Sequence, residues 1–381
     1  MKITDIRLTD TFYVPAKPQQ DAISRLPPVS VQNFCQVFTD EGPVGLVPAS
    51  GGKLTRVLIE EMIRPVLIGE DPMDHERIWQ KMYWGLLSTG RRGAPMIAIG
   101  IVDNAIWDLK GRITGQPVHK LLGCYRDSVP SYGSGINLNL DDDELVAQMA
   151  GFVRAGFRMV KMKIGHPDPQ RDIERIRRVR EAIGPDVDLC VDANNAWSLT
   201  TAIEIARQIE PFDIYWLEEP ILADEIDSLA QLARATRIPI AAGENHYGKW
   251  EFKELIGKRA VAFVQADVVK CGGVTEFLKI AAMADAHGLP VCPHFSNFVD
   301  VACIAAVPNG LVHEFAEDLF EPPARLLESC ARPVDGMIAP LDRPGFGLEL
   351  LPDAAERFGT PPEGGVGRRT TDRARRWPPY L

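Results

Sequence analysis

Residues 189–244 read LCVDANNAWSLTTAIEIARQIEPFDIYWLEEPILADEIDSLAQLARATRIPIAAGE and carry three acids at equal intervals. Asp192, Glu218 and Glu244 each lie 26 residues from the next, and each closes a short apolar stretch typical of a buried strand. An interval of this length accommodates one strand and one helix, so the spacing predicts successive strands of a parallel barrel. The three acids would then lie side by side on the barrel rim.

A rim of three carboxylates predicts a site for a hard cation. Asp192, Glu218 and Glu244 would offer oxygen ligands from three separate strands and leave room for water and a ligand oxygen. Such a site suits Mg²⁺ better than zinc, which would call for His or Cys.

The alternation of short strands and amphipathic helices runs on from about Ser128 for roughly 190 residues, enough for seven or eight strand-helix units. We therefore expect an α/β protein with a modified TIM (β/α)-barrel over residues 128–320. The predicted strand ends lie near Ser134, Lys163, Asp192, Glu218, Glu244, Asp267, His294 and Glu314. Every one after the first is ionisable, and buried charges are costly unless they are paired or bind a metal.

The segments before and after the predicted barrel have different sequence patterns. Residues 1–127 begin with an alternating pattern and continue with three- and four-residue apolar periods, which predicts an α+β capping domain. Residues 321–381 are expected to return to that domain and to end in a basic tail, with arginines from Arg368 to Arg376. For this tail we favour a solvated or subunit-docking role over nucleic-acid binding.

Composition limits the classes of partner. The 381 residues carry a net charge of −10, which argues against nucleic acid and anionic membrane surfaces. Seven cysteines without paired spacing suggest reduced core residues. The N-terminal residues lack an apolar signal core and no run is long enough to cross a bilayer, so the cytoplasm is the expected compartment.

The stretch Lys161-Met162-Lys163 lies in a predicted strand, where a period of two puts both lysines on one face. We expect that face to be the barrel interior, because Met162 would then pack against the outer helices. In a mostly desolvated site with a divalent cation nearby, repulsion between the two ammonium groups would lower the pKa of at least one, making that lysine a neutral base near pH 7. The alternative is a lysine pair that reaches solvent at the barrel mouth.

On the far side of the predicted ring, Asp267 and His294 end adjacent strands. A carboxylate that binds one ring nitrogen fixes the tautomer and raises the basicity of the other, which makes an acid/base pair. Taken alone, His294 is more simply a structural histidine, but its pairing with Asp267 opposite Lys163 favours catalysis.

Two further polar residues are candidates for substrate contacts. Glu314 ends the last strand, and neighbouring carboxylates could keep it protonated so that it donates a hydrogen bond to a substrate oxygen. Asn194 lies two residues after Asp192 and would point the same way, toward a metal-bound oxygen.

These residues together predict proton abstraction beside a carboxylate. The substrate carboxylate would bind Mg²⁺, Lys163 or His294 would remove the α-proton, and the metal and Lys161 would stabilise the enediolate. With bases on both faces, the intermediate is reprotonated, giving racemisation, or loses a 3-hydroxyl, giving dehydration.

The motifs resemble the enolase superfamily, in its mandelate racemase subgroup, over nearly the whole chain. They are Lys161-Met162-Lys163-Ile164-Gly165, Val191-Asp192-Ala193-Asn194, Trp216-Leu217-Glu218-Glu219-Pro220, Gly243-Glu244-Asn245, and Asp267 with His294. The resemblance implies that Asp192, Glu218 and Glu244 bind Mg²⁺, that Lys163 and the Asp267–His294 dyad serve opposite faces, and that Lys161 and Glu314 contact the substrate carboxylate.

The resemblance also implies an activity. It favours an acid-sugar dehydratase that yields a 2-keto-3-deoxy sugar acid, with a racemase, epimerase or lactone cycloisomerase acting on a 2-hydroxy acid as the alternative. A more remote alternative is a catalytically silent protein that binds a sugar acid. We expect a homo-oligomer, from dimer to octamer.

The chain departs from the family in one motif, because Val44–Ser50 lacks the Gly-x-Gly-Glu that many members have. The loop near residues 15–27, which covers the substrate in this family, is polar here, and this suits a hydroxylated substrate. Its polar residues are Lys17, Gln19, Gln20, Asp21, Ser24 and Arg25.

Overall fold

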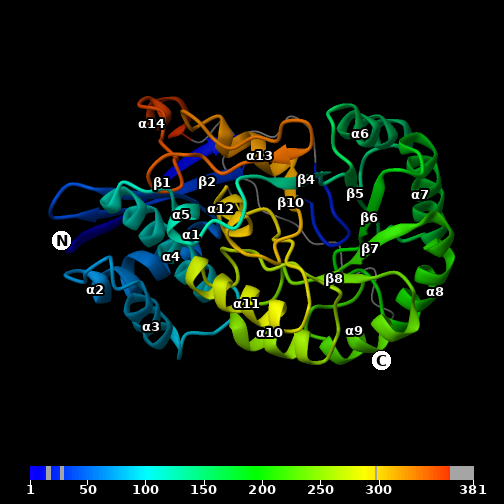
Figure 1. Ribbon diagram of the computed structural model, residues 1–381, viewed down its shortest axis with the longest axis horizontal. Helices are drawn as coiled ribbons and strands as arrows, with labels where there is room; N and C mark the ends of the chain where they lie inside the picture. Colours follow the sequence, from blue (N-terminus) through cyan, green and yellow to red (C-terminus); the bar gives the residue numbers. More distant parts are fainter. Residues whose placement is uncertain (14–18, 26–29, 297, 361–381) are drawn as a thin grey trace.

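The structure is a computed structural model that describes residues 1–13, 19–25, 30–296 and 298–360. It begins with an antiparallel meander of β1 (Ile3–Tyr13), β2 (Ser30–Thr39) and β3 (Val44–Ala49), in that spatial order. Cys35 and Val37, which share one face of β2, are fully buried because this meander packs on the helices that follow. Figure 1 shows this part at the left, in blue.

The capping helices are α1 (Gly52–Val57), the π-helical turn η1 (Leu58–Ile63), α2 (Arg64–Leu67), α3 (His75–Leu86), α4 (Ala94–Thr114) and α5 (Val118–Leu121). Helix α4 is buried almost all round, since it lies between the meander and the barrel. Gly100 on this helix shows how close the barrel approaches: a Cβ atom there would lie 1.9 Å from the carbonyl oxygen of Val269.

The barrel strands are β4 (Val129–Ser134), β5 (Met159–Lys163), β6 (Asp188–Asp192), β7 (Ile214–Glu218), β8 (Ile240–Ala242), β9 (Phe263–Val264) and β10 (His313–Ala316). They pair in parallel in the order β10-β4-β5-β6-β7-β8-β9. Single parallel bridges, Val264 to Val291 and Val291 to Gly310, continue the ring from β9 toward β10. The predicted modified TIM barrel is therefore confirmed.

The helices after these strands are α6 (Asp142–Arg154), α7 (Pro169–Ile183), α8 (Leu199–Ile209) with the 3₁₀ turn η2 (Glu210–Phe212), α9 (Ile226–Ala235), α10 (Gly248–Gly257), α11 (Val274–Ala286), α12 (Val299–Ala306) and α13 (Glu317–Ala324). Helix α8 is typical of the set. Ser198 caps it by accepting a hydrogen bond from the Thr201 amide, and Ala202, Ile205 and Ile209 face the core.

The predicted strand ends are confirmed for half of the ring. Ser134, Lys163, Asp192 and Glu218 are the last residues of β4 to β7. The other four residues lie near the strand ends but not at them: Glu244, Asp267 and His294 lie in loops beyond β8, β9 and the bridge at Val291, and Glu314 is the second residue of β10. The strands on this side are short, so loop backbone brings these side chains to the mouth.

The barrel interior is layered, as the two-residue period of its strands requires. A lower layer contains Tyr132, Met159, Cys190, Trp216 and Val312. Lys161 and Lys163 share the inward face with Met159, while Val160 and Met162 pack outward against the helical core. The expectation that both lysines point into the barrel is thus confirmed.

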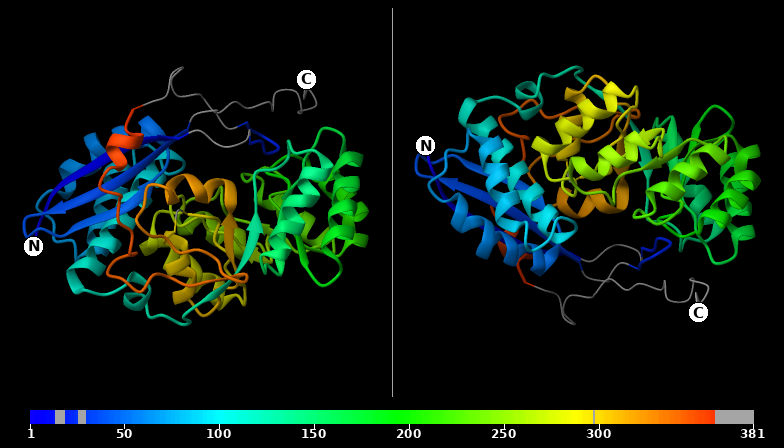
Figure 2. Two further views of the ribbon diagram at one scale, coloured as in Figure 1. Left: turned by 90° about the horizontal axis from the view of Figure 1, so that it is seen from above. Right: turned by 90° about the horizontal axis from the view of Figure 1, so that it is seen from below.

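The C-terminal segment runs back from the barrel to the capping domain. It includes β11 (Met337–Ile338), antiparallel to β4, and α14 (Ala354–Phe358), which lies beside β1 (Figures 1 and 2). The Phe346 amide donates to Asp108 of α4 at 2.7 Å. The predicted basic tail, from Gly364 on, lies outside the described residues, as do residues 15–18 and 26–27 of the predicted covering loop.

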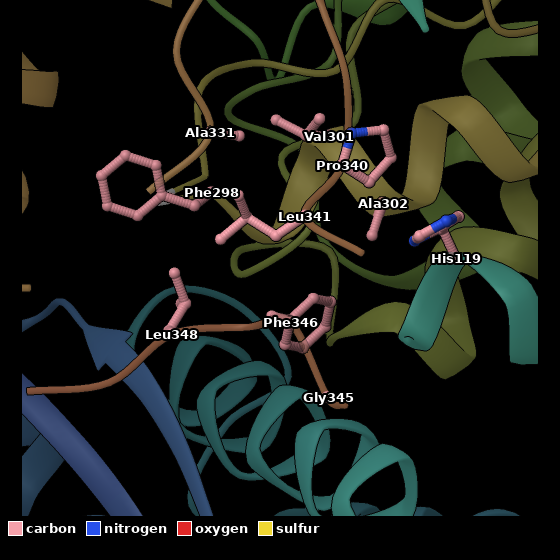
Figure 3. Close-up of a pocket in the computed structure, with 10 residues that line it drawn as sticks. All are labelled: His119, Phe298, Val301, Ala302, Ala331, Pro340, Leu341, Gly345, Phe346 and Leu348. Atoms are coloured by element: carbon pink, nitrogen blue, oxygen red, sulfur yellow. The ribbon is translucent and has the colours of Figure 1, made fainter. Parts of the chain in front are cut away.

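A small apolar pocket lies where this segment meets α12 and α5 (Figure 3). Phe298, Leu341 and Phe346 line it, with His119 at one edge. None of its lining residues belongs to the predicted site. In the part of the chain that the structure describes, no helix combines the length and apolar character needed to span a membrane.

Candidate active site

Three carboxylates converge at the barrel mouth. Asp192 and Glu218 are opposite residues of the paired strands β6 and β7, and Glu244 reaches them from the loop after β8. One oxygen atom from each lies within 4.8 Å of the others, and all three residues are buried. Buried like charges repel, so this arrangement calls for positive charge between them.

Lys161 supplies part of that charge. Its Nζ lies 2.6 Å from Glu218 Oε1 and 2.8 Å from Glu314 Oε1. Burial alone would lower the pKa of Lys161, but Glu218 and Glu314 outweigh burial and raise it well above its ordinary value. Lys161 is therefore a fixed positive charge on the floor of the site.

Lys163 contacts Asp192 Oδ2 with its Nζ. Burial lowers the pKa of Lys163 and Asp192 raises it, with a net rise that the repulsion from Lys161 does not overcome. Without a cation at the carboxylates, the contact with Asp192 thus outweighs the repulsion between the two lysines, and the lowered lysine pKa expected beside a divalent cation stays a prediction. The carboxylates lie nearer to each ammonium group than the sequence alone indicates.

The donor set fits a divalent cation. The ligand atoms would be oxygens of Asp192, Glu218 and Glu244, which are the donors that Mg²⁺ prefers. Burial raises the pKa of the Glu218 carboxyl to about 8 despite the nearby Lys161, so this carboxylate lacks sufficient compensating charge. An added cation would supply it.

Asn194 gives a second indication that a ligand belongs here. Its backbone amide donates to Asp192 Oδ1 at 2.8 Å, and its left-handed conformation, with φ of 41°, turns the residue into the mouth. Asn194 is buried, yet its Oδ1 has no hydrogen-bond partner among the described residues. A buried polar atom without a partner is costly, which favours a bound group beside Asn194.

His294 and Asp267 form the expected pair. His294 Nδ1 lies 2.9 Å from Asp267 Oδ2, and its Nε2 lies 3.3 Å from Glu244 Oε2. Burial would lower the pKa of His294, but Glu244 and Asp267 raise it to about 9. The contact with Glu244 was not foreseen. The contact forms because Glu244 and His294 both lie in loops beyond short strands, and these loops bring the two side chains together at the barrel mouth.

Glu314 lies next to Lys161 on the floor. Its Oε2 also accepts a hydrogen bond from the Phe295 amide at 3.1 Å. Burial would raise the pKa of Glu314, but Lys161 and His294 together lower this pKa to about 2. The expectation that Glu314 is kept protonated by neighbouring carboxylates was therefore wrong, because two cations are closer to it.

Three further polar residues of the site were missed by the sequence reasoning, and of these Gln265 and Glu219 are buried while Lys270 is partly exposed. Lys270 Nζ lies 3.5 Å from Glu244 Oε1, and Gln265 Nε2 donates to Glu218 Oε2 at 2.6 Å. Glu219 accepts hydrogen bonds from the side chain of Asn245 at 2.9 and 2.8 Å. Gln265 precedes Asp267 by two residues in the predicted strand, and this spacing could have indicated Gln265, but no periodicity indicates Lys270.

Residues 19–25 form a hairpin that touches the barrel. Gln20 bridges to Arg25 within the hairpin and to Asn137 in the loop after β4. Gln19 Nε2 donates weakly to the carbonyl oxygen of Asp318, at 3.4 Å. The described part of the polar covering loop therefore lies against the loop after β4.

Comparison with known proteins identifies the relatives of this chain. Residues 14–123 match the family model described as mandelate racemase / muconate lactonizing enzyme, N-terminal domain, and residues 144–354 match that described as enolase C-terminal domain-like. An arabinonate dehydratase from Saccharolobus solfataricus is 33% identical over 372 residues, which are 93% of this chain and 99% of the relative.

Two other relatives differ in the activity that their names state. A 3,6-anhydro-alpha-L-galactonate cycloisomerase from Streptomyces coelicolor is 37% identical over 300 residues, covering 79% of this chain and 82% of the relative. The crystal structure of L-talarate dehydratase from Polaromonas sp. JS666, complexed with Mg and L-glucarate, superposes with a TM-score of 0.83. It is 33% identical and covers 97% of this chain and 99% of its own.

Proposed function

This chain belongs to the mandelate racemase / muconate lactonizing enzyme family of the enolase superfamily, and we propose that it is a magnesium-dependent hydro-lyase that dehydrates a sugar acid. The observation that carries the proposal is the position of the carboxylate triad between two basic groups. Lys163 contacts Asp192 at one end of the triad, and His294 contacts Glu244 at the other.

Asp192, Glu218 and Glu244 would hold Mg²⁺, as their convergence supports. When bound, Mg²⁺ supplies positive charge that polarises a substrate carboxylate and so acidifies the neighbouring α-carbon. We assign proton transfer and stabilisation of the enediolate to side chains of this protein.

Lys163 would take the α-proton in its neutral form, which a divalent cation held by Asp192 would favour because it repels the ammonium charge. The electron pair of the C–H bond moves toward the carboxylate as the enediolate forms. Lys161 Nζ, a fixed cation on the floor, donates to a carboxylate oxygen and stabilises the charge that develops there. Asn194 Oδ1, which has no partner within the described residues, accepts a hydrogen bond from the substrate.

His294 acts on the opposite face as the acid. It delivers its Nε2 proton to the 3-hydroxyl while the C3–O bond breaks and water departs, and Asp267 holds Nδ1 throughout. The resulting enol tautomerises to a 2-keto-3-deoxy acid. Glu314, which is ionised, keeps Lys161 in place instead of donating a proton to the substrate.

A sugar acid is the favoured substrate for two reasons. The dehydratase and cycloisomerase relatives are named for sugar acids or their lactones and anhydro forms. The hairpin that lies against the barrel is polar at Gln19, Gln20 and Asp21, and such residues suit a ligand with many hydroxyl groups. We also propose that the protein forms a homo-oligomer.

An isomerase is the second candidate, because a cycloisomerase relative is 37% identical. The same two bases would then abstract and return the proton on opposite faces without loss of the hydroxyl. A silent binding protein is disfavoured, since it would have no use for two intact bases beside three carboxylates.

The test is a screen of mono- and diacid sugars with the protein and Mg²⁺, detecting 2-keto-3-deoxy products and following proton exchange in D₂O in parallel. The dehydratase assignment predicts keto product with at least one acid. Exchange or inversion without keto product would instead establish the isomerase. Lys163→Ala and His294→Ala should each reduce turnover by about 100-fold or more, as general bases and acids contribute. If neither variant lost activity, the assignment of the two bases would fail.

A further inference from the structure

Asn137 links the end of β5, which carries Lys163, to the loop after β4. It is 1% exposed, and its Oδ1 accepts a hydrogen bond from the backbone amide of Lys163 at 2.9 Å. The register of β4 with β5 stops at the pair Ser134 and Lys161, where β4 ends. The side-chain carbonyl of Asn137 therefore takes the place of the next backbone carbonyl along the ladder.

The backbone of the same segment binds the hairpin of residues 19–25. The Leu138 amide donates to the Gln20 carbonyl oxygen at 3.0 Å, and Gln20 and Asn137 form a parallel bridge. The hairpin is itself closed by Asp21, whose Oδ1 accepts from the Ser24 amide at 2.7 Å and whose Oδ2 accepts from Ser24 Oγ at 2.8 Å. A closed hairpin thus rests on the residue that holds Lys163.

Arg175 of α7 holds the loop after β4 in place at residues 137–140. The guanidinium is almost completely buried and donates to the carbonyl oxygens of Asn137 at 3.0 Å and Leu140 at 2.8 Å. Asp318 supports the other end, where its Oδ2 accepts from the Ile136 amide at 2.8 Å. Because residues 136–140 are held at both ends, a displacement of the hairpin moves the whole segment and so reaches the end of β5.

The hairpin also meets the end of β5 directly. Gly165, two residues after Lys163, has a positive φ of 100°, and a Cβ atom there would lie 2.7 Å from the Cβ of Ala22. The hairpin and the base strand are therefore in contact at Gly165 and joined through Asn137.

We infer that Asn137 is a positioning residue that couples docking of the 19–25 hairpin to placement of Lys163. This inference rests on the proposed role of Lys163 as a base. If the hairpin separates from Asn137, the end of β5 becomes less firmly held. If the hydrogen bond between Asn137 and Lys163 is lost, the hairpin in turn binds less firmly, because a coupling free energy between two sites is reciprocal. Lys163 is then held in its working position only when the hairpin is docked on the loop after β4.

Hydrogen–deuterium exchange of the full chain, without substrate, tests the link from the Asn137 side. Asn137→Ala should speed exchange of the Lys163 amide and of the hairpin amides roughly tenfold, the effect of losing one buried hydrogen bond. Asn137→Asp keeps an acceptor for the Lys163 amide and should restore most of its protection. The matched control is Gln148→Ala, which removes only the partner of Asn137 Nδ2 and should leave the Lys163 amide protected.

The reverse direction uses variants inside the hairpin. Asp21→Ala, and the milder Ser24→Ala, open the turn that these side chains close, and both should speed exchange of the Lys163 amide as well as of the hairpin. If Asn137→Ala affected only one of the two segments, or if the hairpin variants left the Lys163 amide unchanged, the coupling would be refuted. The coupling would also be refuted if Gln148→Ala sped exchange of the Lys163 amide as much as Asn137→Ala does.

Turnover gives a separate readout. On an acid that the wild-type protein converts, Asn137→Ala should lower kcat about tenfold and Asn137→Asp should recover part of that loss, whereas a purely structural defect would lower the amount of folded protein and leave kcat per active site unchanged. An unchanged kcat with Asn137→Ala would refute the positioning role. If the wild-type protein converted no acid, the proposed function would fail, and the exchange measurements would still decide the coupling.

Discussion

The Nδ1 atom of His294 lies 2.9 Å from Oδ2 of Asp267, which joins two loops at neighbouring positions of the ring. The other ring nitrogen, Nε2, consequently faces the carboxylate triad and lies 3.3 Å from Glu244 Oε2. Asp267 is itself held by hydrogen bonds to its Oδ1 from the amides of Val269 and Lys270, both at 2.8 Å. The imidazole is therefore oriented by a carboxylate that cannot easily rotate.

Asp267→Asn is predicted to reduce turnover about 100-fold, because an amide does not select the tautomer or favour the protonated ring as a carboxylate does. Binding of Mg²⁺, measured by calorimetry, should change little, since Asp267 is not one of the three proposed ligands. Asp285→Asn, an exposed change on α11, serves as the control and should retain wild-type turnover. Full activity in Asp267→Asn would show that the dyad has no role.

Glu218→Gln is predicted to weaken binding of Mg²⁺ or Mn²⁺ by at least about 100-fold, the loss expected when a charged ligand becomes a neutral one. The measurement is calorimetric titration of metal into the protein without substrate, so it does not depend on knowing the reaction. Glu204→Gln, at an exposed position of α8, is the matched control. Equal affinities in the two variants would exclude Glu218 as a ligand.

The stability of the protein should depend on pH through Asp103. This residue of α4 is fully buried, and although Thr275 donates to both of its oxygens, burial raises its pKa from 3.8 to about 7. The folded state then holds the proton more tightly than the unfolded state. The stabilising contribution is complete below pH 3.8 and is lost as the pH rises toward 7.

Between those limits, Asp103 is predicted to lower the free energy of unfolding by up to about 1.4 kcal/mol per pH unit. Asp103→Asn mimics the protonated form, so its denaturant-unfolding curves should lack this part of the slope. The difference between wild type and variant is the quantity to measure, since other groups titrate in both. A difference that did not vary with pH would contradict the assignment.

Gly100→Ala should destabilise the junction between the capping domain and the barrel. A methyl group there would lie 1.9 Å from the Val269 carbonyl oxygen, so α4 or the loop after β9 must move, at a predicted loss of about 3 kcal/mol in the free energy of unfolding. Gly85→Ala, inside α3 with nothing within 4 Å, is the matched control and should stabilise by about 0.5–1 kcal/mol. Urea unfolding distinguishes the two, and equal effects would mean that the approach at Gly100 is not tight.

Much of the barrel was predictable because strand periodicity is local. The alternation around Lys161-Met162-Lys163 placed both lysines inside, and they do share the inward layer with Met159. The even spacing of Asp192, Glu218 and Glu244 placed three acids together, which the structure brings within one site. The predicted strand ends differ from the observed ones at β8, β9, the bridge at Val291 and β10, and at the first three of these a loop carries the side chain.

The sequence by itself determined the barrel, the inward residues and the family, since these follow from periodicity, spacing and motifs. The tertiary structure alone decided the charge states and the partners. Glu314 is ionised because Lys161 lies 2.8 Å away, and His294 meets Glu244 because two loops lean together. Desolvation and Coulomb interactions depend on distances in space, and residues that are remote along the chain set those distances.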